Sequence, residues 1–300
     1  MNKPHIGFIG LGIMGTPMSR HLAEAGYELL LYDLNTAPAN KLAEEYENAS
    51  VAENPQAVAE GSDIVITMLP SGRPVQEVTL GENGLIYGFR PGSLLLDTSS
   101  SEPNLTTETA KALKEKGVFM VDAPVSGAQW GAEAAELVFM VGGDQDAVSR
   151  VHPILDIMGN RVFHLGPLGS GHVMKSINNL ITAVTFLATA EGLIIGKKSG
   201  LDPDIMTDVL NESTGMSWIS RTQIKQRIIS RKFDDPFKLG LMFKDVTIAV
   251  EKAKELGLDI PLSFKGRDIW KRAAEFNHIG GSISEMVKYV EDTTGIRIEK

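Results

Sequence analysis

The feature that most constrains the fold is a regular alternation of short β-rich runs and helical patterns, which stops near residue 165. Helical patterns, among them 14–25, 105–116 and 144–158, separate the runs. This alternation is typical of a mostly parallel sheet with helices on both faces, so we predict a doubly wound α/β domain. The predicted strands are His5–Ile9, Leu29–Tyr32, Ile64–Met68, Leu94–Asp97, Phe119–Asp122, Leu137–Val141 and Arg161–Leu165.

The second part of the chain has a different character. After the sequence GPLGSG at 166–171, the β-rich runs disappear and the remaining segments have helical periodicity. A chain of 300 residues is long enough for two cores. We therefore predict an α/β domain over residues 1–165 and an all-α domain over residues 166–300, opened by a long helix at about 171–198.

Composition limits the partners that this chain can have. The formal net charge is −9 and no basic stripe is present, so we expect no nucleic-acid partner. The chain has no cysteine, and its six histidines do not fall at metal-ligand spacing, so we expect no metal site. The apolar run at 180–195 is shorter than a membrane span and contains Glu191, so we expect no membrane partner. The N-terminus lacks the cleavage pattern of a signal peptide, so we expect a cytoplasmic protein.

A glycine-rich turn follows the first predicted strand. Its glycines have the spacing G-x-G-x-x-G, in which the first allows a tight turn, the second leaves room for a pyrophosphate and the third lets a helix pack closely. The helix, expected to start near Ile13, would direct its positive end at the phosphates. The predicted phosphate site comprises Gly10, Leu11, Gly12, Ile13, Met14 and Gly15.

Asp33 ends the second predicted strand, in the sequence LLLYD. A carboxylate at this place can accept hydrogen bonds from both hydroxyls of an adenosine ribose, and it repels a 2′-phosphate. The next residues, Leu34 and Asn35, include no arginine that would bind such a phosphate. We therefore predict NAD as the cofactor in preference to NADP; a solvated carboxylate at a strand end is the alternative.

A second stretch, MLPSGRPV at 68–75, follows another apolar strand. It falls at the carboxyl end of that strand, where parallel sheets bind their ligands. An ordinary strand-end turn would have the same pattern. We interpret four residues of this stretch as lining the cofactor site: Met68, Leu69, Pro70 and Val75.

Lys175 lies at the start of the long apolar helix, and Asn179 follows four residues later. This spacing puts both side chains on one helical face. A lysine in this position either extends its ammonium to solvent or takes part in a site. In a site it can donate a proton to a carbonyl oxygen during reduction and remove one from a hydroxyl during oxidation.

Six segments occur in order along the chain: IGFIGLGIMGTPMSRHL, ITMLP, DTSS, DAPVSGA, GHVMKSINN and FKLGLMFKDVTIA. With these segments the chain resembles the β-hydroxyacid dehydrogenase family over essentially its whole length. The resemblance implies a Rossmann domain followed by an all-helical domain, with the active site between them. It also implies homodimers or homotetramers that associate through the helical domain. The implied reaction is hydride transfer between NAD and a small carboxylate-bearing substrate, of the 3-hydroxyisobutyrate or tartronate semialdehyde type.

The resemblance also implies roles for individual residues. Lys175 would be the general acid/base, and Asn179 would hold its amine or the substrate hydroxyl. The substrate loop would be Ser126, Gly127 and Ala128, whose backbone N–H groups, with the Ser126 hydroxyl, can bind a carboxylate. The remaining implied cofactor residues are Ser99 and Ser100, in the turn that begins at Asp97 beside the nicotinamide, and Lys244 of the K-D pair.

The substrate loop departs from the family pattern, which usually reads S-G-G and later A-x-x-G-T-L. Here the stretch is SGAQWGAEAAEL, with Ala128 and Ala135 in place of glycines and Glu136 in place of threonine. Ala128 adds a methyl group and restricts φ, and Trp130 adds a large side chain nearby. We therefore expect a small β-hydroxyacid or semialdehyde that is not necessarily the substrate of the best-known relatives.

Two other functions fit parts of the pattern. An imine-reductase-like NAD(P)H reductase would share the architecture, but such enzymes usually lack a lysine at the position of Lys175. A protein that senses NAD without turnover would not need Lys175, Asn179 and Lys244 together. Both alternatives predict no oxidation of hydroxyacids.

Overall fold

The structure is a computed structural model that describes residues 3–299. The chain divides into two compact units, unit 1 (Met1–Lys175) and unit 2 (Ser176–Lys300). The strands of unit 1 are β1 (Ile6–Ile9), β2 (Leu29–Tyr32), β3 (Ala49–Val51), β4 (Ile64–Thr67), β5 (Leu94–Asp97), β6 (Phe119–Asp122), β7 (Val125–Ser126), β8 (Leu137–Gly142) and β9 (Gly159–Gly166). Its helices are α1 (Gly15–Glu24), α2 (Thr36–Glu45), α3 (Pro55–Glu60), α4 (Gly72–Leu80), α5 (Leu85–Gly88), α6 (Pro103–Glu115), α7 (Ala128–Glu133) and α8 (Gln145–Met158).

The strands of unit 1 form one mixed sheet. Within residues 3–299 it has nine strands in the order β3-β2-β1-β4-β5-β6-β8-β7, with β9 paired to β8. The strands from β3 to β6 are parallel to their neighbours, whereas β8 is antiparallel to β6 and β7. The order β3-β2-β1-β4-β5-β6 is that of dinucleotide-binding domains, which bind their ligand at the carboxyl ends of the strands, where the strand order reverses.

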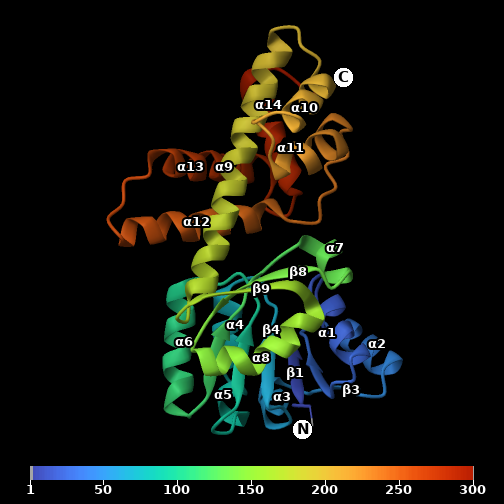
Figure 1. The fold of residues 1–300 in the computed structure, drawn as a ribbon, viewed down its shortest axis with the longest axis vertical. Coiled ribbons are helices and arrows are strands. Elements are labelled where there is room, and N and C mark those ends of the chain that lie inside the picture. Colours follow the sequence, from blue (N-terminus) through green and yellow to red (C-terminus); the bar gives the residue numbers. More distant parts are fainter. Residues whose placement is uncertain (1–2, 300) are drawn as a thin grey trace. The chain divides into compact units, whose positions relative to one another are not determined.

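Helices cover both faces of this sheet (Figure 1). Because successive side chains of a strand point to opposite faces, each strand contributes to two cores. In β1, Ile6 and Phe8 pack with α1, α2 and α8, and Ile9 packs with α3, α5 and α6. The predicted doubly wound α/β domain is therefore confirmed.

The regular secondary structure described in unit 2 is helical, apart from one isolated antiparallel bridge between Lys238 and Ser282. Its core contains Phe186, Val246 and Trp270, all fully buried, and the Trp270 indole donates a hydrogen bond to the Ala183 carbonyl oxygen at 3.1 Å. The helices are the continuation of α9 (Ser170–Lys198), then α10 (Pro203–Asn211), α11 (Trp218–Thr222), a π-helical turn η1 (Ile224–Ile229), α12 (Leu239–Glu255), α13 (Pro261–Asn277), a 3-10 turn η2 (Ile283–Glu285) and α14 (Met286–Thr294).

The long helix α9 begins within unit 1. The division between the units falls after Lys175, later than the predicted boundary at residue 165. The physical reason is that a methyl group on Gly171 would lie 2.1 Å from the Met140 carbonyl oxygen, so the first turn of α9 packs directly on β8. Helix α9 is long and apolar enough to cross a membrane by length and composition. Its residues Phe186 and Leu193 are nevertheless buried in the core of unit 2.

The structure also corrects local predictions. Helix α1 begins at Gly15 rather than near Ile13, with Met14 as its N-cap residue. From the helical periodicity of the second part of the chain we predict one helix at 217–230, but this segment forms α11 followed by the π-helical turn η1. Four short elements have no counterpart among the predicted ones, because each has too few residues to show periodicity: β3, β7, α5 and α7.

Candidate functional site

The glycine-rich turn between β1 and α1 has the geometry of a phosphate-binding turn. Gly10 has a φ of +97°, and a side chain there would lie 2.3 Å from the Met68 carbonyl oxygen. A Cβ on Gly15 would lie 1.8 Å from the Gly10 carbonyl oxygen, so α1 starts directly against the turn. A Cβ on Gly12 would meet no described atom within 4 Å. The turn therefore leaves open space at the position where a pyrophosphate is expected.

Asp33 lies at the carboxyl end of β2 and is bonded to this turn. Its Oδ2 accepts a hydrogen bond from the Leu11 N–H at 2.6 Å, and its Oδ1 accepts one from the Asn35 N–H at 2.8 Å. A carboxylate has about four acceptor positions, so two hydrogen bonds leave room for the hydroxyls of a ribose. The turn and Asp33 together fit the adenosine and pyrophosphate parts of NAD.

The two predicted turns after β4 and β5 lie side by side. The Leu69 N–H donates a hydrogen bond to the Ser99 Oγ at 2.9 Å. Pro70 is exposed, and Met68, Leu69 and Ser100 are half-buried. The side chains of Ser99 and Val75, at 0% and 2% exposed, are instead buried in unit 1.

The predicted substrate loop joins β7 to α7. Gly127 has a φ of +139°, and the next residue, Ala128, has a φ of +53°. Ser126, Gly127 and Ala128 are half-buried, and the Trp130 side chain is 58% exposed. His21 Nε2 lies 3.0 Å from the Ala132 carbonyl oxygen near the end of α7, so α1 contacts the helix that follows this loop.

Lys175 lies in the second turn of α9 and is half-buried. The start of this helix is fixed to the end of β6, because Asp122 accepts hydrogen bonds from the N–H groups of Gly169 (2.7 Å) and His172 (2.8 Å). Burial raises the pKa of the Asp122 carboxyl above its usual range, although a charge on His172 and the two N–H groups act in the opposite direction. Lys175 therefore lies one helical turn after a residue that is hydrogen-bonded to the carboxyl end of β6.

A second polar cluster lies in unit 2. Asn179 is 5% exposed, and its amide nitrogen donates a hydrogen bond to Asp245 Oδ2 at 2.6 Å. The other oxygen of Asp245 lies 3.0 Å from the Lys244 Nζ. The Asn178 amide donates to the Asn179 Oδ1 at 3.0 Å. The structure thus brings two predicted residues of unit 2, Asn179 and Lys244, together through Asp245.

Three residues of these clusters have no role predicted from the sequence: Asp122, His172 and Asp245. Asp122 and Asp245 lie in two segments that carry the family resemblance, DAPVSGA and FKLGLMFKDVTIA, so their positions could have identified them as site residues. His172 carried no signal, because a single histidine beside an apolar run is usually an ordinary core residue. Within residues 3–299, no group of three or more His, Asp or Glu side chains could hold a metal ion.

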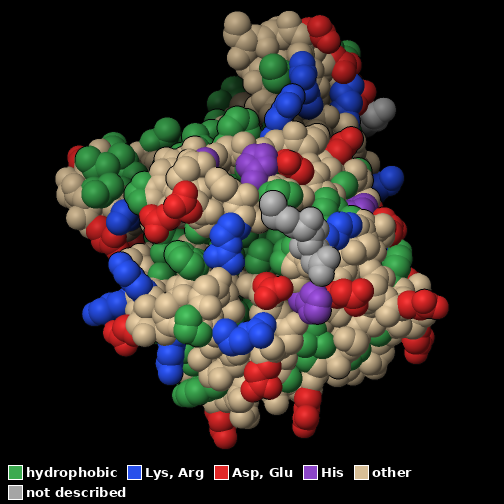
Figure 2. Space-filling view, turned by 60° about the horizontal axis from the view of Figure 1, so that its bottom comes forward, with side chains coloured by type: hydrophobic (Ala, Val, Ile, Leu, Met, Phe, Trp, Pro, Cys, Tyr) green, Lys and Arg blue, Asp and Glu red, His purple; other side chains and the backbone are tan. Residues whose placement is uncertain are grey.

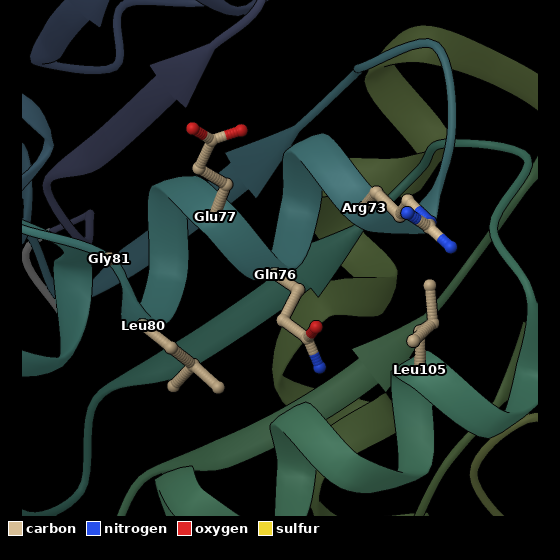
Figure 3. Close-up of a pocket in the computed structure, with 6 residues that line it drawn as sticks. All are labelled: Arg73, Gln76, Glu77, Leu80, Gly81 and Leu105. Atoms are coloured by element: carbon tan, nitrogen blue, oxygen red, sulfur yellow. The ribbon is translucent and has the colours of Figure 1, made fainter.

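An open depression of about 550 Å³ lies between α4 and α6 (Figure 3). Arg73 and Glu77, its charged side chains, are both exposed, and none of the predicted site residues lines it. It is therefore a surface groove between two helices, apart from the candidate site. Its lining residues are Arg73, Gln76, Glu77, Leu80, Gly81 and Leu105.

Charged side chains of both signs are interspersed on the surface. Figure 2 shows Lys and Arg side chains among Asp and Glu side chains on one face of the protein. Ion pairs such as Lys41–Glu45 and Arg90–Asp63, both at 3.8 Å, are part of this pattern.

Two family models match the chain. Residues 5–166 match the NAD-binding domain of 6-phosphogluconate dehydrogenase. Residues 169–290 match the NAD-binding domain of NADP-dependent 3-hydroxyisobutyrate dehydrogenase. The two matches divide the chain at the glycine-rich segment before α9.

Individual relatives cover nearly the whole chain. The chain is 34% identical to 2-(hydroxymethyl)glutarate dehydrogenase of Eubacterium barkeri over 98% of its length and 97% of that protein. It is 35% identical to mitochondrial 3-hydroxyisobutyrate dehydrogenase of Mus musculus, over 97% of its length and 88% of that protein. Among solved structures, 3-hydroxyisobutyrate dehydrogenase of Mycobacterium tuberculosis with L-serine has a TM-score of 0.87 at 30% identity, covering 96% of this chain and 99% of that one.

Proposed function

Because the chain belongs to the β-hydroxyacid dehydrogenase family, an NAD(P)-dependent group of oxidoreductases, we propose that it interconverts a small β-hydroxyacid and its semialdehyde with Lys175 as general acid/base. The observation that carries this proposal is the position of Lys175. It stands in the second turn of a helix whose first turn is hydrogen-bonded to the strand ends of a dinucleotide-binding sheet.

The cofactor would be held by the residues that already have the required geometry. These are the turn around Gly12, which is open for a pyrophosphate, and Asp33, whose carboxylate is fixed beside it. Bound NAD supplies the hydride acceptor for oxidation of the hydroxyl, and NADH the donor for reduction of the carbonyl. A carboxylate at position 33 would repel a 2′-phosphate, which supports NAD over NADP as the working cofactor.

Interconversion of a hydroxyl and a carbonyl moves a proton as well as a hydride. Lys175 would carry this proton. In the oxidation, its neutral amine removes the proton of the substrate hydroxyl while the carbon that bears this hydroxyl loses its hydride to NAD⁺. In the reduction, its ammonium returns a proton to the carbonyl oxygen. Asn179, held by Asp245 and Asn178, would orient the hydroxyl or the amine.

The substrate class follows from what the relatives' substrates have in common. 2-(Hydroxymethyl)glutarate and 3-hydroxyisobutyrate both bear a primary alcohol on the carbon β to a carboxylate, and L-serine, named with the Mycobacterium tuberculosis structure, does too. The Ser126 hydroxyl and the N–H groups of Gly127 and Ala128 are the groups proposed to bind that carboxylate.

Subunits are proposed to associate through the helical unit.

The test is a substrate panel followed by NADH absorbance. The purified enzyme is assayed with NAD⁺ and 3-hydroxyisobutyrate, L-serine, 2-(hydroxymethyl)glutarate and glycerate. It is also assayed with NADH and the corresponding semialdehydes or cyclic imines, and NADH binding is measured by fluorescence titration. Turnover of at least one β-hydroxyacid pair is expected. NADH oxidation only with cyclic imines would indicate the imine-reductase alternative, and NADH binding without turnover of any compound would indicate a sensor.

A further inference from the structure

His172 lies at the centre of a buried polar cluster in unit 1. Its side chain is fully buried, and so are the side chains of Asp97 and Asp122 on either side of it. Its Nε2 lies 3.5 Å from Asp97 Oδ2, and its Nδ1 lies 3.6 Å from Asp122 Oδ2. A buried imidazole between two strand-end carboxylates is costly to place, so its hydrogen bonds need an explanation.

Those hydrogen bonds join three elements. His172 Nε2 lies 3.1 Å from the carbonyl oxygen of Ser99, in the turn after β5. A carbonyl oxygen only accepts, so Nε2 carries the hydrogen and donates it. His172 Nδ1 lies 2.8 Å from the Thr106 hydroxyl on α6. One side chain of α9 is therefore attached to the turn after β5 and to a helix on one face of the sheet.

The two carboxylates make this attachment rigid. Asp97 Oδ1 accepts hydrogen bonds from the Thr67 hydroxyl at 2.9 Å and the Ser99 N–H at 3.0 Å, and Oδ2 accepts one from the Ser101 hydroxyl at 2.8 Å. Asp122 accepts from the N–H group of His172 itself. Both the backbone and the side chain of His172 are thus held at the ends of β5 and β6.

Lys175 follows His172 by three residues, so the two lie on neighbouring positions of the same helical surface. We propose that His172 is a positioning residue: its hydrogen bonds to Ser99 and Thr106 set the rotation and height of the first turns of α9, and so the place of the Lys175 ammonium. This inference rests on the proposed function, in which Lys175 carries the proton. Misplacing a reacting group by about 1 Å can cost about 10²-fold in rate.

The test compares two substitutions of His172. In His172→Gln the amide group can donate to the Ser99 carbonyl and accept from the Thr106 hydroxyl. In His172→Leu the volume is similar, but both hydrogen bonds are lost. We expect His172→Leu to lower kcat by about 10-fold to 100-fold, with the KM for NADH and the Kd of NADH within about threefold of the parent. His172→Gln should recover most of the lost kcat.

A matched control separates positioning from general loss of stability. Val148→Ala removes methyl groups from a buried residue of α8 in the same unit, whose apolar side chain takes no part in the hydrogen bonds of the cluster. It should lower the thermal midpoint at least as much as His172→Leu and leave kcat unchanged. If kcat falls equally in both variants, or if His172→Gln is as impaired as His172→Leu, the hydrogen bonds of His172 do not position Lys175.

A second measurement needs no turnover. Hydrogen exchange of the backbone amides at 170–176 reports how firmly the first turns of α9 are held. His172→Leu should speed this exchange at least about tenfold, and His172→Gln should restore the parent rate. Unchanged exchange in His172→Leu would overturn the positioning role even if the enzyme is active. Faster exchange in His172→Leu, combined with a parent that turns over no hydroxyacid, would contradict only the proposed function.

Discussion

Lys175 is the residue on which the proposed reaction depends most. Lys175→Met keeps an unbranched side chain that is one atom shorter and removes the amine that carries the proton, so kcat should fall roughly 10²–10⁴-fold while NADH binding is nearly preserved. Lys175→Arg should be almost as inactive, because a guanidinium does not release its proton near neutral pH. The measurements are steady-state kinetics and NADH fluorescence titration. Lys198→Met, at the exposed end of the same helix, should have full activity. A loss of less than about tenfold in Lys175→Met would exclude it as the proton carrier.

Asp33 should determine which cofactor is used. The parent should have a higher kcat/KM with NADH than with NADPH, because the carboxylate repels a 2′-phosphate. Asp33→Asn can still accept the hydrogen bond from the Leu11 N–H, but it removes the charge. It should therefore narrow the preference without disturbing the glycine turn. Equal kcat/KM values for the two cofactors in the parent would show that Asp33 does not select NAD.

Two alanines in the substrate loop have backbone conformations that favour glycine. Ala128 and Ala135 have φ values of +53° and +55°, where an L-residue costs about 1 kcal/mol or more. Ala128→Gly and Ala135→Gly should each raise the free energy of unfolding by up to about 1 kcal/mol, measured in urea. The control is Ala134→Gly, since Ala134 has a φ of −89°. That change should lower stability, and a gain in all three variants would refute the conformational explanation.

The same substitution bears on substrate choice. The methyl group of Ala128 takes up space in the loop proposed to bind the substrate carboxylate. Ala128→Gly should therefore change the ranking of kcat/KM among 3-hydroxyisobutyrate, L-serine and longer β-hydroxyacids. Ala135→Gly relaxes the backbone further along the stretch and should leave the ranking unchanged. If neither variant alters it, Ala128 has no part in specificity.

At the scale of residues, the sequence identifies a site residue when a reactive or ligand-binding residue type stands next to a recognisable strand end or helix start. The glycines of the turn, Asp33 and Lys175 could be identified because each follows a strand or opens a helix that its neighbours reveal. His172 could not, because its partners Asp97 and Thr106 are distant in the chain and meet only in the folded sheet. The side chains of Val75 and Ser99 are buried in unit 1, and the place of these residues in the cofactor site stays a prediction.

At the scale of elements, the central strands were predictable and the short ones were not. Strands such as β1 and β4 are buried along their whole length and have continuous apolar sequences. Strand β3 has three residues, of which only the first is buried, so its sequence has no strand signal. The π-helical turn η1 interrupts a segment with helical periodicity, and periodicity alone does not reveal a change in hydrogen bonding.

The junction of β6 with α9 predicts a pH dependence of stability. Burial raises the pKa of Asp122 in the folded state above the ordinary value of 3.8 for this carboxyl group, which serves as the reference for the unfolded chain. Between these two values the folded protein binds more protons than the unfolded chain, so this carboxyl lowers stability as the pH rises through the window. Above the folded pKa its cost is constant.

Asp122→Asn should remove this dependence. The free energy of unfolding in urea, measured from about pH 4 to neutral pH, should decrease less with rising pH in the variant than in the parent. Asp259→Asn, at an exposed position of unit 2, is the control and should follow the parent. A parallel pH dependence in the parent and in Asp122→Asn would show that the pKa of Asp122 is not raised.

At the scale of the whole molecule, the change from mixed sheet to helices is visible in the sequence, but the attachment of the start of α9 to unit 1 is not. The segment 166–171 has the glycines of a linker, which predicts a boundary there. The fold instead hydrogen-bonds Gly169 and His172 to Asp122, which joins the first turns of α9 to unit 1. Long-range bonds of this kind leave no local pattern.

An apolar stripe on α9 predicts the assembly state. The stripe comprises Ile177, Ile181, Ala188, Gly192 and Ile195, all exposed, at spacings of three, four and seven residues. Ile181 and Ile195 are 61% and 68% exposed, which is unfavourable for side chains of this size in water. Such spacing is typical of a seam between packed helices, so we expect a second copy of the chain to cover it.

Light scattering coupled to size exclusion tests this expectation. The parent should have the mass of two or four chains. Ile181→Glu should shift it toward the mass of a single chain, because a buried, unpaired carboxylate in an apolar contact is strongly unfavourable. Leu34→Glu changes a residue of unit 1 that is 92% exposed, and it should leave the mass unchanged. A parent with the mass of one chain would leave this stripe without a partner subunit, and an Ile181→Glu variant that stays assembled would place the interface elsewhere.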